Sequence, residues 1–168
     1  MVYKMQIYAD GGCRYNGHPH AIGASAIIFK KRKSRWRPSH VISLLRNPPP
    51  TSQRAELSAI ILALEKAIEK PNHLRNNPRL DVTIFTDSRY ALGCMTVWSE
   101  RWRENEWVNS RGLEVVNRDL IERAMELEGE LRGLGRLRYT WIERGENARA
   151  DKLCGQELNR QEKGEEED

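Results

Sequence analysis

The chain has 168 residues, of which 39% are hydrophobic and 31% charged, and its mean hydropathy is −0.73. This length suffices for one domain with a proper core, and the composition excludes a disordered chain. No apolar run approaches the roughly 20 residues that a membrane span requires, and the first residues lack a secretory signal, so we expect no membrane association. Three scattered cysteines predict neither a disulfide framework nor a zinc site, and they favour a reducing, intracellular compartment.

The charge is divided between a basic body and an acidic end. The last eight residues contain five acidic residues and one basic residue, so residues 1–160 carry a net charge of +8. A basic body of this kind indicates a polyanionic partner. We expect residues 161–168 to form a disordered acidic tail.

The first half of the chain predicts strands followed by a helix. Apolar runs predict strands at residues 2–9, 21–30 and 40–46. We expect a Gly-Gly turn after Asp10 and a basic hairpin tip between the second and third strands. After the break at NPPP, residues 51–70 predict the strongest helix, capped by Thr51 or Ser52.

The second half alternates strands and helices. We expect strands at 80–87 and 136–142, and helices at 88–102, 117–130 and 147–160. Asp87 or Ser88 can cap the first of these helices, and Asn147 the last. This order predicts a single α/β domain over residues 1–160. Three antiparallel strands come first, and parallel crossovers through helices follow.

Four acidic residues occupy positions where a carboxylate is costly. Asp10 and Asp87 each end a predicted strand, so neighbouring strands would bring them to one edge of the sheet. Glu56 lies on the apolar line of its own helix, and Asp151 shares a helix face with Cys154 and Leu158. A buried carboxylate is normally paired or bound to a metal ion.

Each acid also has an ordinary role when it is taken singly. Asp10 fits a turn, Asp87 a helix cap, Glu56 the partner of a buried arginine, and Asp151 an acid in the first turn of a helix. One fold, however, would bring all four to the same edge. Clustered carboxylates without a nearby histidine or cysteine suit Mg²⁺ or Mn²⁺. Two such ions would balance four negative charges, in the arrangement that supports in-line phosphoryl displacement.

Four segments carry a resemblance to a known family: YADGG with Asp10, TSQRAELSAI with Glu56, FTDSRY with Asp87, and NARADKL with Asp151. In order and spacing, over about residues 3–160, the chain resembles type 1 ribonuclease H. The resemblance implies an RNase H-like fold, with a five-stranded mixed sheet flanked by helices. It also implies that the four acids hold two Mg²⁺ ions, for which Mn²⁺ is a possible substitute.

The same resemblance implies an activity and a partner. The chain would be an endoribonuclease that hydrolyses the RNA strand of RNA–DNA hybrids without sequence specificity. The products would carry 5′-phosphate and 3′-hydroxyl ends. No protein partner is implied, and we expect a monomer.

The resemblance extends to residues that contact nucleic acid. Residues 98–116 are similar to the basic protrusion of many family members, in which aromatic side chains lie against DNA sugars. Trp98 and Trp102 share a helix face, a spacing that is also common in protein cores. The implied contacts are Tyr90, Trp98, Trp102 and Ser110 for the DNA channel; Thr51 and Asn117 for a DNA phosphate; Asn16, Ser52 and Gln53 for the minor groove; and Gly11, Gly12 and Cys13 for close backbone approach. A plain turn is the alternative for Asn16 and Gly17.

Two positions depart from the family pattern. Pro49 stands where the family usually has an arginine of the phosphate pocket, for which Arg46 or Arg54 is a candidate substitute. The connection WIERGENARAD lacks the usual loop histidine, as in histidine-less variants of the family. Our hypothesis is that Glu143 or Glu146 partly takes over the role of that loop.

The basic segment 30–37 holds six basic residues in eight and has three interpretations. It fits a grip on the duplex backbone, a nuclear-import signal or a solvated hairpin tip. For the whole chain, two further functions stay open. One is a hybrid- or duplex-binding module without catalysis, and the other is the ribonuclease H domain of a reverse transcriptase.

Overall fold

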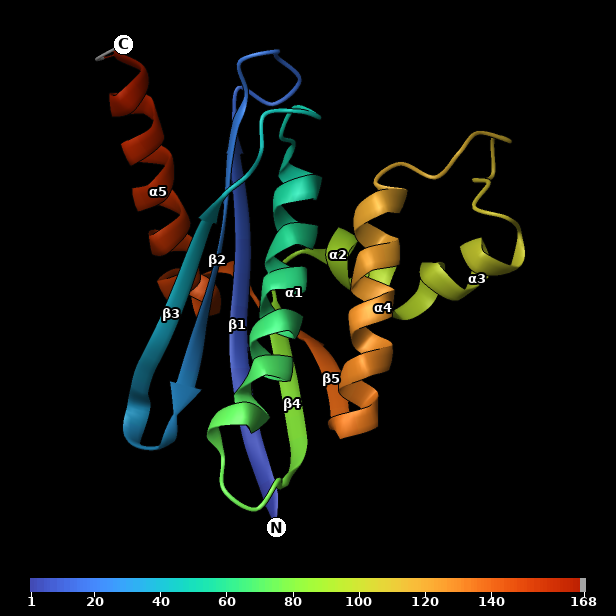
Figure 1. The fold of residues 1–168 in the computed structure, drawn as a ribbon. Coiled ribbons are helices and arrows are strands. Elements are labelled where there is room, and N and C mark those ends of the chain that lie inside the picture. The colour runs from blue at the N-terminus through green and yellow to red at the C-terminus, as the bar shows by residue number, and fades with distance from the viewer. Residues whose placement is uncertain (167–168) are drawn as a thin grey trace.

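The computed structural model describes residues 1–166, which form one five-stranded sheet in the order β3-β2-β1-β4-β5 (Figure 1). The strands are β1 (Val2–Arg14), β2 (Ile22–Lys31), β3 (Arg35–Ser43), β4 (Arg79–Thr86) and β5 (Gly135–Trp141). β1 pairs antiparallel with β2, and β2 with β3, whereas β1 with β4 and β4 with β5 are parallel pairs. The predicted fold class is therefore confirmed.

The helices lie on both faces of this sheet (Figure 1). They are α1 (Ser52–Glu69), α2 (Arg89–Gly93), a π-helix (Cys94–Trp98), α3 (Ser99–Glu104), α4 (Arg118–Leu134) and α5 (Ala148–Glu166). Helices α1 and α4 pack together over one face, while α5 packs on the other face against β1 and β2. Within residues 1–166, no helix is both long and apolar enough to cross a membrane.

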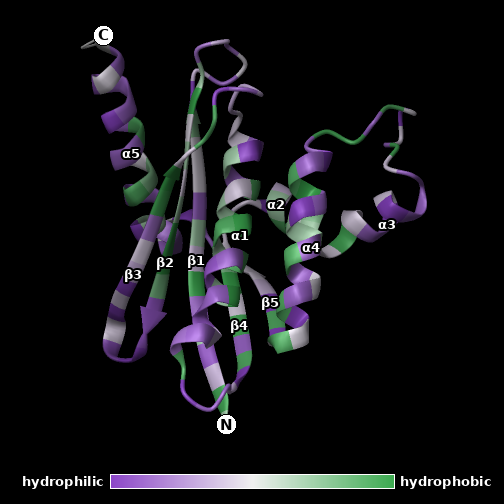
Figure 2. Ribbon diagram, viewed as in Figure 1, coloured by the Kyte–Doolittle hydropathy of each residue, from purple (hydrophilic) through white to green (hydrophobic). Residues whose placement is uncertain are grey.

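The core lies between the sheet and the pair α1–α4. Met5, Ile7 and Ala9 of β1 alternate with more exposed residues, because successive side chains of a strand point to opposite faces. They pack in one cluster with residues of α1 such as Leu57 and Ile60. Figure 2 shows hydrophobic residues on the central strands, and hydrophobic and hydrophilic residues in alternation along α1 and α4.

The expected Gly-Gly turn after Asp10 is wrong, because β1 continues through both glycines to Arg14. Gly11 and Gly12 pair with Ser25 and Ala24 of β2. A Cβ atom on Gly11 would lie 2.2 Å from the carbonyl carbon of Ala55 in α1. The glycine is thus required for the close approach of α1 to the strand, and not for a turn.

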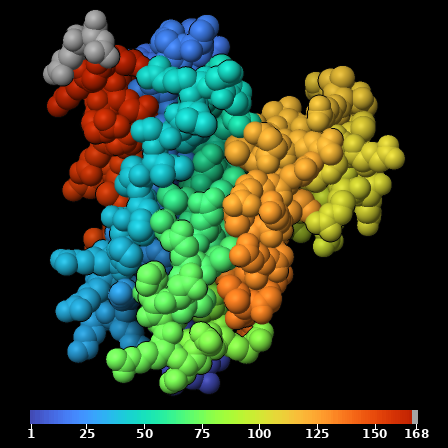
Figure 3. All heavy atoms as spheres, viewed as in Figure 1, coloured from blue at the N-terminus to red at the C-terminus, as the bar shows by residue number. Residues whose placement is uncertain are grey.

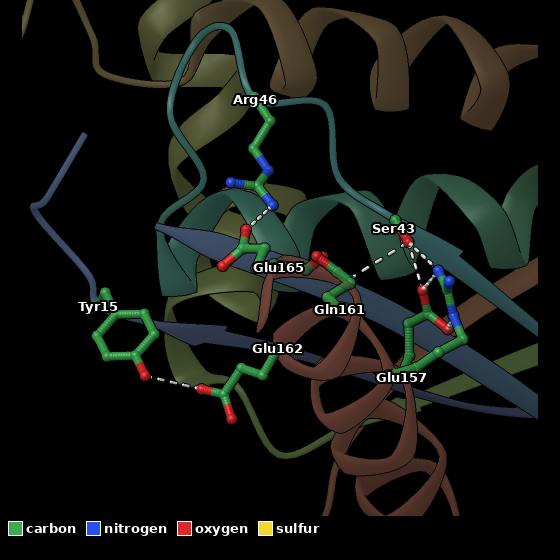
Figure 4. A network of polar contacts seen from close by, with 9 residues as sticks. Tyr15, Ser43, Arg46, Glu157, Gln161, Glu162 and Glu165 are labelled. Carbon is green, nitrogen blue, oxygen red and sulfur yellow. Dashed lines mark hydrogen bonds and ion pairs between the residues drawn. The ribbon is translucent and has the colours of Figure 1, made fainter. Parts of the chain in front are cut away.

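The expected disordered tail is also wrong for residues 161–166, which continue α5 as a helix. Figure 4 shows why: acidic residues of this last part of α5 reach basic and hydroxyl groups of neighbouring segments. Glu162 accepts from Arg14 at 2.7 Å and from the Tyr15 hydroxyl at 3.0 Å, and Glu165 pairs with Arg46. These ion pairs hold the helix on the strands. Residues 167–168 of the predicted tail lie outside the described residues.

The predicted helix at 88–102 is interrupted: it consists of α2, the π-helix and α3 in succession. Figure 3 shows the segment around residues 98–116 standing out from the body as a protrusion. Its base is closed by Trp107, which is buried, and by the hydrogen bond from the Trp107 amide to the Trp102 carbonyl at 2.7 Å. The basic hairpin tip is narrower than predicted, because β3 begins at Arg35 and only Arg32–Ser34 form the tip.

Candidate active site

The four predicted acids come from four elements around the centre of the sheet. Asp10 lies in β1, and Asp87 follows β4 directly. Because Ala9 pairs with Thr86, the last residue of β4, in the parallel ladder, Asp10 and Asp87 each follow a paired position on adjacent strands; β4 ends there, whereas β1 continues to Arg14. Glu56 comes from the second turn of α1 and Asp151 from the first turn of α5.

Asp10 is the most perturbed of these groups. Its side chain is buried, with 8% of the residue exposed. Burial, followed by the negative charges of Asp87 and Asp151, raises the pKa of Asp10 to about 8. The charges of Asp87 and Asp151 add to the effect of burial because both acids lie close to Asp10. Asp10 also sits inside a strand, which excludes a turn role for it.

Glu56 is oriented by a neutral hydrogen-bond donor. The Ser88 hydroxyl donates to the Glu56 carboxylate and accepts from the Ala91 amide at 3.0 Å, so Ser88 is also the cap of α2. Burial raises the pKa of Glu56, and the hydrogen bond from Ser88 opposes that shift. Ser88, and not Asp87, therefore caps the helix, and Ser88 takes the place of the arginine partner considered for Glu56.

Two further residues hold the end of β4 in place. The Asn147 side-chain amide donates to the Ala9 carbonyl at 2.9 Å and to the Asp87 carboxylate at 3.4 Å. The Trp141 indole donates to the Asp87 carbonyl at 3.2 Å, and its ring lies 4.1 Å from the Arg89 guanidinium. The position of Asn147 in the sequence predicts only a helix cap and gives no sign of this role. No local pattern could have found it, because the partners of Asn147 are 60 and 138 residues away in the chain.

The donor set fits a hard divalent cation, although the carboxylates are not converged on one point. Among the described residues, no group of three His, Cys, Asp or Glu side chains is arranged to hold a metal ion. The Glu56 carboxylate faces Ser88, and Asp151 is exposed, 4.0 Å from Arg144. Oxygen ligands with an uncompensated negative charge are nevertheless what Mg²⁺ and Mn²⁺ prefer. The four-residue ligand set stays a prediction.

A groove of about 530 Å³ joins most of the residues predicted to contact nucleic acid outside the channel. It is lined by Asn16, Gly17, Thr51, Ser52, Gln53, Val116 and Asn117. Thr51 is the cap of α1 and accepts from the Arg54 amide at 3.1 Å. Asn117 donates to the Tyr90 hydroxyl at 3.0 Å, which links this groove to the predicted DNA channel.

Arg54 lies at the predicted phosphate pocket, whereas Arg46 does not. The Arg54 guanidinium donates to Asn117 at 3.3 Å and forms a two-point contact with Asp119 at 3.0 and 2.8 Å. Arg46 is instead paired with Glu165 of α5. Of the two substitutes considered for the arginine absent at Pro49, the geometry favours Arg54.

The aromatic residues of the protrusion form a chain of neighbours. Ring centroids lie 6.4 Å apart for Tyr90 and Trp98, 5.9 Å for Trp98 and Trp102, and 6.4 Å for Trp102 and Trp107. Trp98 is 37% exposed, Trp102 packs partly on the core, and Trp107 is buried. The core alternative considered for Trp98 and Trp102 thus holds only in part for Trp102, and Trp98 offers an open face. Ser110 is exposed in the loop beyond them.

The three residues predicted for close backbone approach sit where other elements touch β1. Gly11 lies under α1, and a Cβ atom on Gly12 would meet the Leu158 side chain of α5 at 3.2 Å. The Cys13 thiol donates to the Pro50 carbonyl at 3.5 Å. Their contact with nucleic acid stays a prediction.

Comparison with known proteins identifies the family. The RNase H family model matches residues 3–159. A ribonuclease H of Schizosaccharomyces pombe is 35% identical over 124 residues, which are 74% of this chain but 41% of that protein. A ribonuclease H of Neorickettsia sennetsu is 32% identical over 136 residues, 81% of this chain and 78% of that protein. The crystal structure of LC11-RNase H1 in complex with an RNA/DNA hybrid has the same fold, with a TM-score of 0.61, 21% identity, and coverage of 90% of this chain and 94% of that one. The chain belongs to the ribonuclease H family of nucleases.

Proposed function

We propose that this chain hydrolyses the RNA strand of RNA–DNA hybrids without base specificity and leaves 5′-phosphate and 3′-hydroxyl ends. The observation that carries the proposal is the buried Asp10, whose pKa is raised to about 8 by its burial and by Asp87 and Asp151. Carboxyl groups whose pKa is shifted by burial and by neighbouring charges cluster at functional sites, where a cation or a reacting group makes use of them. The hybrid in the related LC11 structure supports the choice of substrate.

Asp10, Glu56, Asp87 and Asp151 would hold two Mg²⁺ ions, or Mn²⁺ in their place. Such ions lower the pKa of bound water and stabilise the leaving oxygen. The protein itself supplies position: Asn147 and Trp141 fix the end of β4 beside β1, and Ser88 orients Glu56 until a cation competes for it. These contacts are neutral, so they orient the carboxylates without cancelling their charge.

The groove and the protrusion would select the hybrid. A-like duplexes expose 2′-hydroxyl groups in a wide, shallow minor groove, and Asn16, Ser52 and Gln53 offer amide and hydroxyl groups for it. Thr51, Asn117 and Arg54 would hold a phosphate of the DNA strand. The open face of Trp98 would lie against a DNA sugar, where a 2′-hydroxyl does not fit.

Cleavage assays test this function. Labelled hybrid, double-stranded RNA and double-stranded DNA are incubated with Mg²⁺ and with Mn²⁺, and only the hybrid is expected to be cut. Asp10→Asn should abolish cleavage and keep hybrid binding. Asp81→Asn is the matched control, because Asp81 lies on β4 and pairs with Arg138 at 3.0 Å, and it should keep both properties. Equal cleavage of all three duplexes, or full activity of Asp10→Asn, would refute the proposal.

The connection before α5 carries a narrower hypothesis. Glu143 and Glu146 are exposed at the short helical turn Arg144–Asn147, where the family usually places a histidine loop. Either carboxylate would assist proton movement or product departure. Glu143→Gln and Glu146→Gln are expected to lower turnover, and unchanged turnover in both variants would exclude the hypothesis.

A binding module without catalysis is the second candidate. The carboxylates of the described residues are not converged for a metal ion, which favours binding alone. The same assay decides: a chain that binds the hybrid with the affinity of Asp10→Asn, and cuts it in neither metal, is such a module.

A further inference from the structure

On the side of the sheet that α5 packs against, no helix within residues 1–166 covers the part of β1 near its N-terminus. We call this part of the sheet the open face. Lys4, Gln6 and Tyr8 alternate with the buried residues of β1, so they point to the face opposite α1. Asp10 is two residues further along the same strand and shares that face. The candidate active site and the open face are therefore continuous along β1.

The open face holds a large groove with a basic lining. Its volume is about 1020 Å³, twice that of the groove beside Thr51. The charged residues that line it are Lys4, Lys30, Lys31, Arg32, Lys33, Arg35, Arg138 and Asp81. Asp81 is already paired with Arg138 at 3.0 Å, so six positive charges are left without a counter-charge in the groove.

The β2–β3 hairpin brings like charges together. The strand register places Lys31 opposite Arg35, and like charges in that position destabilise a hairpin. In the part of the chain that the structure describes, no basic side chain of residues 30–37 forms an ion pair. The arrangement is unfavourable in the free protein and becomes favourable when a polyanion binds.

Aromatic rings connect this hairpin to the active-site side. Trp36 of β3 meets Tyr8 edge-on at 4.8 Å, and Tyr8 stacks on Phe85 at 4.6 Å. The Arg149 guanidinium lies over Trp36 at 4.7 Å, and the Lys30 ammonium lies over the same ring at 5.4 Å. Trp36 thereby holds one cation near the start of α5 and another at the groove.

We propose that this surface, the basic track (Lys4, Lys30, Lys31, Arg35 and Arg149), binds the phosphates of a single-stranded continuation of the RNA strand. The inference rests on the proposed function, because it takes the strand at the four acids to be RNA. Along β1, the distance from Asp10 to Lys4 at the far end of the basic track is about 20 Å, at about 3.3 Å per residue. At about 3.4 Å per nucleotide of a stacked strand, this is about six nucleotides.

A single strand fits the placement better than a duplex. The β2–β3 hairpin and the protrusion with α3 lie on opposite sides of the strands that carry Asp10 and Asp87 (Figure 1). A duplex whose DNA strand occupies the protrusion would have to separate before its RNA strand followed β1 to the hairpin. Phosphate contacts of this kind are independent of base sequence and sensitive to salt.

Binding of hybrids with and without overhangs tests the track. Affinities are measured without divalent cations for a 12-base-pair blunt hybrid, for the same hybrid with an eight-nucleotide 5′ or 3′ RNA overhang, and for the eight-nucleotide RNA alone. The test variant is Lys31→Gln with Arg35→Gln. The control is Arg75→Gln with Arg123→Gln, which removes two exposed charges elsewhere. Because Lys31 and Arg35 are exposed and repel each other, the test variant should melt no lower than the unmodified protein.

We expect one overhang polarity to tighten binding about tenfold in the unmodified protein and in the control, and the test variant to lose this gain. Blunt-hybrid affinity should change less than twofold, and the salt slope for the overhang should fall by about 1.4, which corresponds to two phosphate contacts on a single strand. The proposal is overturned if no overhang adds affinity or if the test variant keeps the gain. It is also overturned if the blunt hybrid weakens equally, since this would show a duplex contact. Failure of the proposed function is distinct: it appears as absent cleavage of the blunt hybrid, while RNA binding still reports on the track.

Discussion

Replacing Asp10 with asparagine should stabilise the protein in the absence of metal ions. The Asp10 carboxyl binds its proton more tightly in the folded protein than in the unfolded chain, since its pKa rises from 3.8 to about 8. Between pH 3.8 and about pH 8 the folded protein binds more protons than the unfolded chain does. The free energy of unfolding therefore falls as pH increases through this range. The asparagine side chain of the Asp10→Asn variant carries no charge at any pH and removes this loss.

The size of the effect follows from the shift. At pH 7 the charged Asp10 costs about 4 kcal/mol, because each unit of pKa difference corresponds to about 1.4 kcal/mol and about three units lie below pH 7. At pH 4 the same calculation leaves about 0.5 kcal/mol. In the Asp10→Asn variant the hydrogen bond from the Gly11 amide would lose its charged acceptor, so we expect a net gain of about 2–4 kcal/mol at pH 7.

Urea unfolding of the metal-free protein at pH 4, 7 and 8 measures this gain, and Asp81→Asn is the control for an acid already paired with an arginine. Adding Mg²⁺ should then stabilise the unmodified protein more than Asp10→Asn, because a cation relieves the repulsion only where the charge is present. A gain of equal size at pH 4 and pH 8 would show that charge is not the cause. No gain at either pH would refute the electrostatic account of Asp10.

Five further substitutions test the surroundings of the site, and two of them, Gly129→Ala and Trp107→Ala, serve as comparisons. Arg54→Ala should weaken hybrid binding about tenfold, measured by fluorescence anisotropy, because it removes the cation at the predicted phosphate pocket. Gly11→Ala should lower the free energy of unfolding by about 3 kcal/mol through its clash with α1. Gly129→Ala, in α4 with no atom near the added methyl group, should raise it by about 0.5–1 kcal/mol. Trp98→Ala should reduce hybrid affinity about tenfold with little loss of stability, whereas Trp107→Ala should cost about 3–5 kcal/mol of stability.

Local patterns in the sequence were sufficient to predict the strands in chain order and to single out the four acids. Alternating apolar residues mark β1 and β4, and Asp87 follows the end of β4 directly, whereas Asp10 lies inside β1, which runs on to Arg14. Ser88 was recognised as a possible cap from its position before α2. Such features depend on neighbours within one or two turns of the chain, which a sequence displays directly.

Long-range contacts account for what could not be predicted. A Gly-Gly pair resembles a turn unless α1 is known to press against it, and an acidic end resembles a tail unless Arg14 and Arg46 are known to face it. The role of Asn147 depends on Ala9 and Asp87 together. In each case the partner lies far away in the chain, so the residue type alone suggests a more common local role.

The placement of charge around the acids favours a site that receives its cation from solution. In the described part of the chain, Asp151 alone of the four acids has an ion-pair partner, the exposed Arg144 at 4.0 Å. Asp87 and Glu56 are held by an amide and a hydroxyl group, which orient a carboxylate and leave its charge in place. Arg54 and Arg46 are paired with Asp119 and Glu165, outside the group of four acids. An arginine beside Asp10 would have compensated the charge of that carboxylate and would have competed with any divalent ion, so the uncompensated charge of Asp10 is what a divalent cation bound there would relieve.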